Sequence, residues 1–358
     1  MKHHLKTRLL LGACLVAAAT APAEEIATNA VPGLKLETEQ KPLKNRFGLS
    51  YRPGFNINAT FKGLGAFPAQ TNPGPPTGRA NRFYDDGYVR PDSGSSPGLT
   101  WFWGYDNNSQ VPGNDTIQFH SSSSTGTGVS DDDSGSPQHG LELSYDRYFG
   151  KVGKRASWGL EAAFNYNNVT INDSSPVVSS VQQLTDAYAL NGVIPPEAPY
   201  SGTFTGPGPL ISDLPSRSFA TIPGGARVTG KREFDANMFG VRLGPYIEIP
   251  LDKRERFNVS FSGGLAMAVV SGEFSYREST TIQGAGTVQS SGSGTDSEFL
   301  VGGYFGGNVS YSFTKAWSVF AGASYQYLSN YSQKVNGREI ELDFSKSVFV
   351  NLGFGFSF

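Results

Sequence analysis

The thirteen residues K-S-V-F-V-N-L-G-F-G-F-S-F (346–358) decide the fold. Side chains of a β-strand alternate between two faces, and one face of this segment carries only apolar residues: Val348, Val350, Leu352, Phe354, Phe356 and Phe358. The other face is small or polar apart from Phe349. The stretch from Val348 to Phe358 has the length of about 9–11 residues with which a tilted strand crosses a bilayer. It predicts a membrane-spanning strand that needs a partner on each edge.

The same alternation recurs in seven further segments: 47–61, 141–145, 158–166, 239–249, 257–269, 299–313 and 317–327. In the first of them the apolar side holds Phe47, Leu49, Tyr51, Phe55, Ile57 and Phe61, opposite Gly48, Ser50 and Arg52. A strand that is buried on one face reads in this way. The pattern predicts an all-β protein with eight antiparallel strands.

Three features favour a membrane barrel over a soluble sandwich, whose strands also alternate. Connections between the segments alternate between short and long, and the presumed lipid face lacks charge, which would cost about 2–4 kcal/mol at the midplane. Aromatic residues also rim the apolar face in two girdles, as in membrane barrels. One girdle holds Trp158, Tyr311, Phe313 and Trp317, and the other holds Tyr166, Tyr325 and Tyr327.

The start of the chain predicts export. Three basic residues precede a short apolar run at 9–19, and Ala21-Pro22-Ala23 follows. This order is typical of a secretory signal peptide, which we place at 1–23. The alternative is a lipoprotein signal ending at Cys14, the only cysteine. Cleavage after Ala23 removes that cysteine, so the mature chain could form no disulfide.

Composition excludes several classes of protein. Charged residues are 17% of the chain, below the roughly 25% of soluble domains. The signal peptide removes three of 29 basic residues, which leaves 26 against 31 acidic ones and a net charge of −5. This balance offers no electrostatic footprint for nucleic acid. A chain with 44 glycines and 13% aromatic residues instead favours apolar surface on strands.

The whole pattern resembles a small bacterial outer-membrane β-barrel. The end of the chain, with Phe354, Phe356 and Phe358 at alternate positions, is similar to the C-terminal signal of such proteins. The resemblance implies a closed, up-and-down barrel over 45–358, with short periplasmic turns and long extracellular loops. It also implies location in the bacterial outer membrane, contact with outer-membrane lipid and lipopolysaccharide, and insertion by the barrel-assembly machinery.

The strand count has an alternative of ten, because segments 84–89, 100–106 and 115–120 lie between the first two assigned strands. We interpret them as strand extensions or as a folded part of a long loop at 63–136. A second long loop is expected at 171–230. Gly-, Ser- and Thr-rich stretches at 121–137, 201–225 and 283–296 predict mobile loop tips. Residues 24–44 are polar and predict a periplasmic N-terminal segment.

A barrel of eight strands is narrow enough for side chains to fill its lumen. Six charged residues alternate with the apolar ones along these segments and should therefore point inward: Arg52, Glu142, Asp146, Glu161, Arg242 and Glu248. Buried charges need partners, so we expect an ion-pair layer with Arg52 near Glu142 or Asp146, and Arg242 near Glu161. Such a layer acts either as a structural plug or as a gate for a narrow ion path.

Catalysis finds little support in the sequence. Ser-His-Asp chemistry needs its three groups in contact, and the mature chain has only His120 and His139. An Asp–His site at the outer rim could recruit Asp85, Asp86 and His120, but no spacing singles them out. The Asp131-Asp132-Asp133 run suits a solvated loop better than a Ca²⁺ site. We therefore expect no catalytic residues, no metal and no cofactor.

Two functional classes remain. The first is a non-enzymatic surface barrel with a filled lumen, which anchors long loops that bind an extracellular ligand or serve a structural role. The second is a porin-like pore for small solutes or ions. An outer-membrane hydrolase is a remote third reading. Bilayer conductance separates the first two.

Overall fold

The computed structural model describes residues 43–132 and 136–358. The predicted signal peptide and nearly all of the predicted periplasmic segment lie outside the described residues. The described chain is all-β and its strands pair antiparallel, as predicted, with one 3-10 turn at Asn108–Gln110. Its main sheet holds 14 strands.

Eight strands of this sheet form a closed circuit of pairings, which we call the ring. In spatial order they are β1 (Asn45–Tyr51), β9 (Gly140–Val152), β10 (Ala156–Asp173), β14 (Ser216–Pro250), β15 (Phe257–Ile282), β16 (Gly286–Ser312), β17 (Trp317–Leu328) and β20 (Ser347–Ser357), which pairs with β1 again. The C-terminal strand therefore has a partner on each edge. Because the sheet as a whole holds more strands than eight, the number that crosses a membrane stays a prediction.

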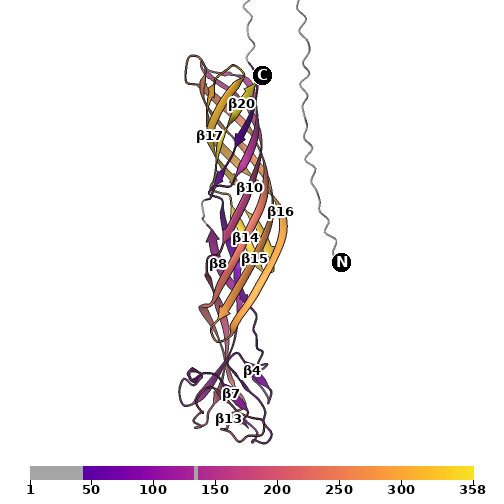
Figure 1. The fold of residues 1–358 in the computed structure, drawn as a ribbon, viewed down its shortest axis with the longest axis vertical. Coiled ribbons are helices and arrows are strands. Elements are labelled where there is room, and N and C mark those ends of the chain that lie inside the picture. The colour runs from indigo at the N-terminus through magenta and orange to yellow at the C-terminus, as the bar shows by residue number, and fades with distance from the viewer. Residues whose placement is uncertain (1–42, 133–135) are drawn as a thin grey trace, which may run out of the picture. The chain divides into compact units, whose positions relative to one another are not determined.

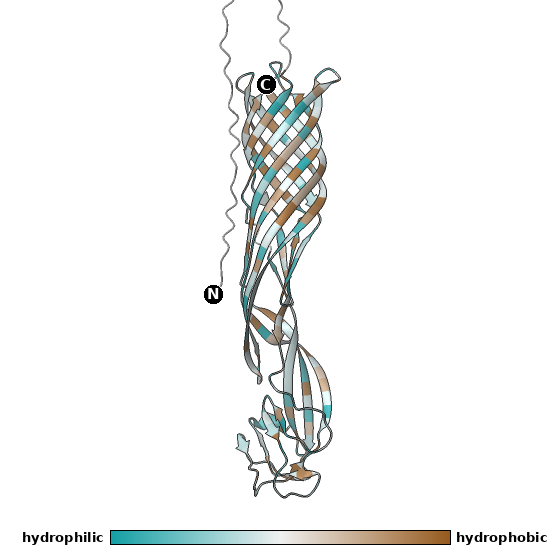
Figure 2. Ribbon diagram, turned by 90° about the vertical axis from the view of Figure 1, so that its right-hand side faces the viewer, coloured by the Kyte–Doolittle hydropathy of each residue, from teal (hydrophilic) through white to brown (hydrophobic). Residues whose placement is uncertain are grey.

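Hydrophobic and hydrophilic residues alternate along the strands of the ring (Figure 2), and the apolar side chains are the exposed ones. Along β14, for example, Val241 and Leu243 are exposed while Arg242 between them is buried. Exposed large apolar residues occur on all eight strands: Phe47, Leu49, Tyr51, Leu141, Leu143, Trp158, Leu160, Phe164, Phe239, Val241, Leu243, Phe257, Phe261, Leu265, Val269, Phe299, Val301, Phe305, Val309, Trp317, Tyr325, Tyr327, Val350, Leu352, Phe354 and Phe356. They are far more than the scattered apolar residues of an ordinary soluble surface.

A second curved layer, the distal sheet, continues from the far ends of β14, β15 and β16 (Figure 1). From β14 the pairing passes to β11 (Val177–Ala189), β8 (Thr116–Asp132), β3 (Asn58–Phe67), β19 (Arg338–Asp343) and β18 (Tyr331–Val335). No strand pairing joins β18 back to β16 within the described residues. Side chains bridge this seam: Gln333 Nε2 donates to the Gly294 carbonyl at 2.6 Å, and Glu298 accepts from Ser332 N at 3.2 Å.

The outward and inward faces of the strands exchange apolar and polar residues where the ring meets the distal sheet. On β14 the outward side changes from Phe239 to Asn237, while the inward side changes from Arg242 to Met238 and Phe234, which are fully buried. The change occurs at the same register on the two neighbouring strands, since Phe239 pairs with Val269 and Val269 pairs with Phe299. One step further, Asn237 pairs with Ser271 and Ser271 with Ser297. The distal sheet therefore encloses an apolar core.

The interpretation of 47–61 as one strand is wrong beyond Tyr51. The chain leaves the ring after β1, makes the short β2 (Gly54–Phe55) against β20, and enters β3. Asn56 takes a positive φ of 57° between these strands. Ile57 and Phe61 consequently turn into the distal core, where Phe61 is fully buried.

The long connections are folded, so the mobile tips predicted at 121–137, 201–225 and 283–296 are wrong for their described strand residues. All of 121–132 lies in β8, whose first part, up to Ser123, pairs with β11 and whose second part, from Ser124, pairs with β3. Hydroxyl groups add to these ladders, since Ser124 Oγ and Ser179 Oγ lie 2.8 Å apart. Residues 216–225 start β14, and 286–296 lie in β16. Backbone pairing on neighbouring strands outweighs the low strand preference of glycine and serine.

Residues 68–115 and 190–215 build a small unit that we call the tip. It contains the sheet of β4 (Arg82–Tyr84), β5 (Gly87–Val89), β7 (Trp103–Tyr105) and β12 (Tyr200–Ser201), and the pair β6 (Leu99–Thr100) and β13 (Ile211–Ser212). Its apolar core joins Trp103 to Phe119 of β8 and Tyr188 of β11. The interpretation of 84–89, 100–106 and 115–120 as a folded loop with strand extensions agrees with this arrangement.

Among the described residues, no helix is both long and apolar enough to cross a membrane.

Candidate functional site

The interior of the ring centres on Glu142 of β9. Arg242 Nη2 donates to Glu142 Oε1 at 2.7 Å, and Arg52 Nε lies 3.0 Å from Glu142 Oε2. Asn351 Nδ2 adds a hydrogen bond of 3.0 Å to the same carboxylate. Arg242 also lies 3.8 Å from Glu161 Oε1, which accepts from Tyr304 Oη. These groups are almost fully buried.

Arg52 is held on several sides. Its guanidinium donates to Asn167 Oδ1 at 2.9 Å and Gln326 Oε1 at 2.7 Å, and lies 3.6 Å from the centre of the Phe349 ring. A cation over an aromatic face is attracted by the ring quadrupole. Phe349, the apolar exception on the inner face of the last strand, therefore supports the buried arginine.

A second cluster lies nearer the short turns and involves a residue that the sequence analysis missed. Arg46 Nε donates to Asp146 Oδ2 at 2.8 Å, and Arg46 Nη1 donates to Glu248 Oε2 at 2.7 Å. Arg46 lies two residues before Gly48, on the same parity as Ser50 and Arg52. Extending the alternation of the first segment by two residues toward the N-terminus would have identified Arg46 as inward-facing.

All six predicted interior charges thus meet partners inside the ring. The structure brings Arg52 to Glu142 and not to Asp146, whose partner is Arg46. It brings Arg242 to Glu161 and, more closely, to Glu142. The space left among Arg46, Glu142, Asp146, Glu161, Arg242 and their neighbours is about 30 Å³. Since one water needs roughly 10–15 Å³ on this measure, this cavity has room for about two waters.

The predicted girdle residues and C-terminal aromatics lie on the outer side of the ring. Near the short turns, the rings of Phe257 and Tyr311 are 4.7 Å apart, those of Trp317 and Phe356 5.0 Å, and those of Phe149 and Trp158 5.3 Å. Phe313 is also exposed there. Phe358 stacks on Phe47 at 5.5 Å and its N–H donates to the Asn45 carbonyl at 2.9 Å. At the other edge Tyr166 packs on Phe239, and Tyr325 and Tyr327 are exposed.

The distal sheet holds an ion-pair cluster that the sequence analysis did not identify. Buried Arg232 donates to Asp173 Oδ2 at 2.6 Å and to Glu278 Oε1 at 3.3 Å. Glu278 also accepts from Arg338 at 3.2 Å. The parity of β14 directs Arg232 inward with Phe234, and this was the available signal.

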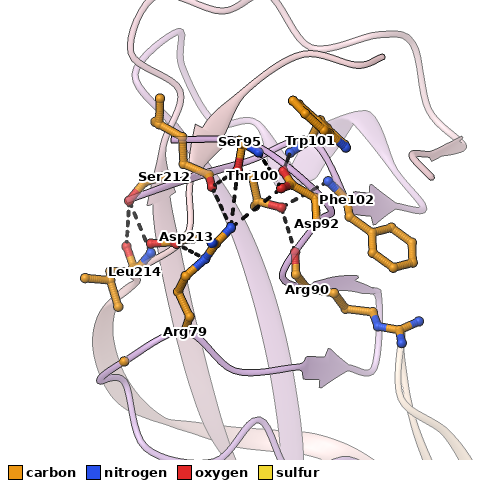
Figure 3. Close-up of polar contacts among 12 residues, drawn as sticks. Arg79, Arg90, Asp92, Ser95, Thr100, Trp101, Phe102, Ser212, Asp213 and Leu214 are labelled. Carbon is orange, nitrogen blue, oxygen red and sulfur yellow. Dashed lines mark hydrogen bonds and ion pairs between the residues drawn. The ribbon is translucent and has the colours of Figure 1, made fainter. Parts of the chain in front are cut away.

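Polar side chains tie the tip together (Figure 3). Arg79 Nε lies 2.9 Å from Asp213 Oδ2, and Asp92 accepts from the backbone N–H groups of Gly94, Ser95 and Trp101 at 2.8–3.0 Å. Burial raises the pKa of Asp92, but these N–H donors and the Ser95 hydroxyl outweigh it and lower the pKa to about 2. At the base of the tip, Asp186 accepts two hydrogen bonds of 2.7–2.8 Å from Arg217 and one of 2.6 Å from Tyr84.

The residues weighed for catalysis come together at the hairpin between β4 and β5. His120 Nδ1 lies 2.7 Å from Asp86 Oδ2, and Asp86 also accepts from His120 N. Asp85 accepts from Ser122 N at 2.7 Å and from Thr71 Oγ1 at 2.8 Å. Each carboxylate thus joins the hairpin to β8. His139 lies elsewhere and contacts Tyr51 Oη. Within the described residues, no group of three or more His, Cys, Asp or Glu side chains could hold a metal.

No family model and no curated protein matches the chain. Solved structures similar to it include Ail, the attachment invasion locus protein of Yersinia pestis, at 8% identity and a TM-score of 0.28, covering 88% of this chain and 99% of that one. The outer membrane protease OmpT from Escherichia coli matches at 12% identity and 0.27, covering 89% and 98%. A Pseudomonas aeruginosa FadL homologue matches at 11% and 0.18, covering 88% and 90%. These values are too low to support an argument about function.

Proposed function

We propose that this chain is a non-enzymatic outer-membrane β-barrel, in which a filled ring of eight spanning strands anchors the distal sheet and the tip outside the cell. The observation that carries the proposal is the reversal of faces along β14, β15 and β16. A strand whose outward residues are apolar for one stretch and polar for the next crosses from lipid into water. Spanning barrels are apolar outside and polar within.

The orientation follows from the connections. The turns at 153–155, 251–256 and 313–316 are short and lie at the same end as Asn45 and Phe358. Outer-membrane barrels have short periplasmic turns and longer extracellular connections. The distal sheet and the tip would accordingly face the cell exterior, beside lipopolysaccharide. The aromatic C-terminus would remain on the periplasmic side, where assembly machinery acts.

A plugged lumen is favoured over a pore by the ion-pair layer. The cavity among these charges offers only about 30 Å³, and opening the lumen would require separating Arg52 and Arg242 from Glu142. Removing one partner of a buried pair costs about 3–5 kcal/mol. The distal core, which includes Phe61, Phe234 and Phe274, provides a second closure above the ring.

A structural role for the Asp–His cluster supports the non-enzymatic reading. Both carboxylates accept backbone N–H bonds, so their bonds fix the hairpin at the base of the tip. We therefore propose that the exposed loops of the tip bind an extracellular ligand or serve a structural role.

Two measurements test the proposal. Purified protein in detergent should migrate faster on a gel before heating than after, because a closed barrel resists unfolding by detergent alone. Reconstituted in planar bilayers, it should show no steady conductance. The double variant Arg52→Ala/Arg242→Ala should conduct or unfold more readily. Loss of the heat-dependent migration would reject the barrel, whereas steady conductance by the unaltered protein would favour the pore.

A further inference from the structure

The charged side chains inside the ring do not sum to zero. Three arginines, Arg46, Arg52 and Arg242, face four carboxylates, Glu142, Asp146, Glu161 and Glu248. The other titratable groups in the same space are Tyr246 and Tyr304, whose phenols are neutral at pH 7. Counted together, these groups carry a net charge of −1, although each carboxylate has an arginine partner and the side chains of Arg46 and Glu248 are 24% and 20% exposed. One further positive charge in this space would bring the sum to zero.

Two oxygens mark where that charge would lie. Asp146 Oδ1 and Asn351 Oδ1 accept no hydrogen bond, although their residues are only 7% and 4% exposed. Each residue uses its other polar atom: Asp146 Oδ2 accepts from Arg46, and Asn351 Nδ2 donates to Glu142. Both residues line the cavity of about 30 Å³. A buried acceptor without a donor costs about 1–3 kcal/mol in general, and here two of them border one space.

The rest of the cavity supplies further oxygens. Ser260, Asn308 and Ser310 line it beside the carboxylates of Asp146 and Glu161. Carboxylate, amide and hydroxyl oxygens suit hard cations. The volume accommodates about two water-sized species, which corresponds to an ion and one water.

We propose that this cavity binds one monovalent alkali cation, which neutralises the interior of the ring. A monovalent ion fits the net charge of −1, since a divalent ion would leave the interior with a net charge of +1. The cation would bind Asp146 Oδ1 and Asn351 Oδ1. Its role is to stabilise the filled barrel, and the site goes beyond the anchoring function proposed above.

The test measures thermal unfolding of the full-length protein, folded in detergent, at constant ionic strength. NaCl or KCl replaces choline chloride stepwise, because choline is too large for the cavity. The expected result is a saturable rise of the unfolding midpoint by at least about 2 °C. A midpoint that is the same in choline and in alkali salts would overturn the proposal.

Charge-neutralising variants locate the site. Asp146→Asn and Glu161→Gln each bring the interior to three positive and three negative charges, so both should lose the response to Na⁺ and K⁺. Glu273→Gln makes the same change on an exposed residue of β15 and should keep it. If both interior variants respond like the unaltered protein, the site is elsewhere. If the midpoint follows pH and not the cation, a proton on a carboxyl group neutralises the layer, and the proposal is wrong.

Discussion

The ring and the distal sheet share the long strands β14, β15 and β16, but they place their apolar residues on opposite faces. In the ring, Leu265 of β15 is outward and half exposed, whereas in the distal sheet Phe274 of the same strand is inward and fully buried. Strand geometry keeps even- and odd-numbered residues on fixed sides throughout. The comparison shows that backbone continuity determines where a side chain points. The surrounding medium determines which residue type is stable there.

The largest expected effect contrasts two phenylalanines of β14. Phe234→Ala empties a fully buried site that contacts Tyr331 at 5.5 Å between rings, so it should cost the distal sheet about 3–5 kcal/mol. Phe239→Ala, on the outside of the ring, should cost much less. Proteolysis in increasing urea would show earlier cleavage of the distal sheet in Phe234→Ala. Equal sensitivity of the two variants would contradict the difference between the regions.

The next contrast adds an arginine at two outward positions of β15. Leu265→Arg lies in the ring and should cost about 2–4 kcal/mol, as a charge does near the bilayer midplane. Glu273→Arg lies eight residues further, on the exposed outside of the distal sheet, and should change stability by less than about 0.5 kcal/mol. The readout is the urea midpoint of the heat-modifiable band in liposomes. If Leu265→Arg is also neutral, that surface does not face lipid.

A smaller effect concerns pH and the tip. The folded-state pKa of Asp92 is about 2, below its ordinary value near 3.9. A depressed pKa contributes stability that is full above the unfolded-state value and is lost as pH falls through the folded-state value. Between about pH 4 and pH 2 the tip should therefore become more sensitive to an acid protease.

The matched variant for this test is Asp92→Asn, which cannot ionise. Its tip should be less stable at neutral pH and should lose less stability on acidification. The heat-modifiable band of the ring serves as the internal control. A variant with the same pH profile as the unaltered protein would show that another group controls the acid response.

The smallest effect lies at the seam between β16 and β18. Gln333→Ala removes the side-chain bond to the Gly294 carbonyl and should cost about 1 kcal/mol. Hydrogen exchange should accelerate in β18 more than in β8, which pairs with β11 and β3 and is not a neighbour of this seam. Thr60→Ala on β3 serves as a surface control, because its hydroxyl bonds only Asp131 at the exposed side of a paired strand. Uniform acceleration would mean that the seam does not open separately.

Sequence patterns predicted the ring because its outer face is apolar and its inner face polar along every strand. The same alternation predicted the inward position of six charged residues: Arg52, Glu142, Asp146, Glu161, Arg242 and Glu248. It failed at Ile57 and Phe61, because alternation alone does not reveal whether the apolar side faces lipid or a protein core. It also failed in β8, whose serines and threonines are stabilised by neighbours far apart in sequence. Arg232 and Glu278 form an ion pair across neighbouring strands. Predicting such a pair requires the register, that is, which residues of the two strands lie opposite each other.

The continuity of β14, β15 and β16 has a mechanical consequence. A pulling force on the tip along these strands would load their interstrand hydrogen bonds in shear, so that many must rupture together. A tether made of a flexible linker would extend first and transmit little tension. Three unbroken strands pass the load directly to the ring.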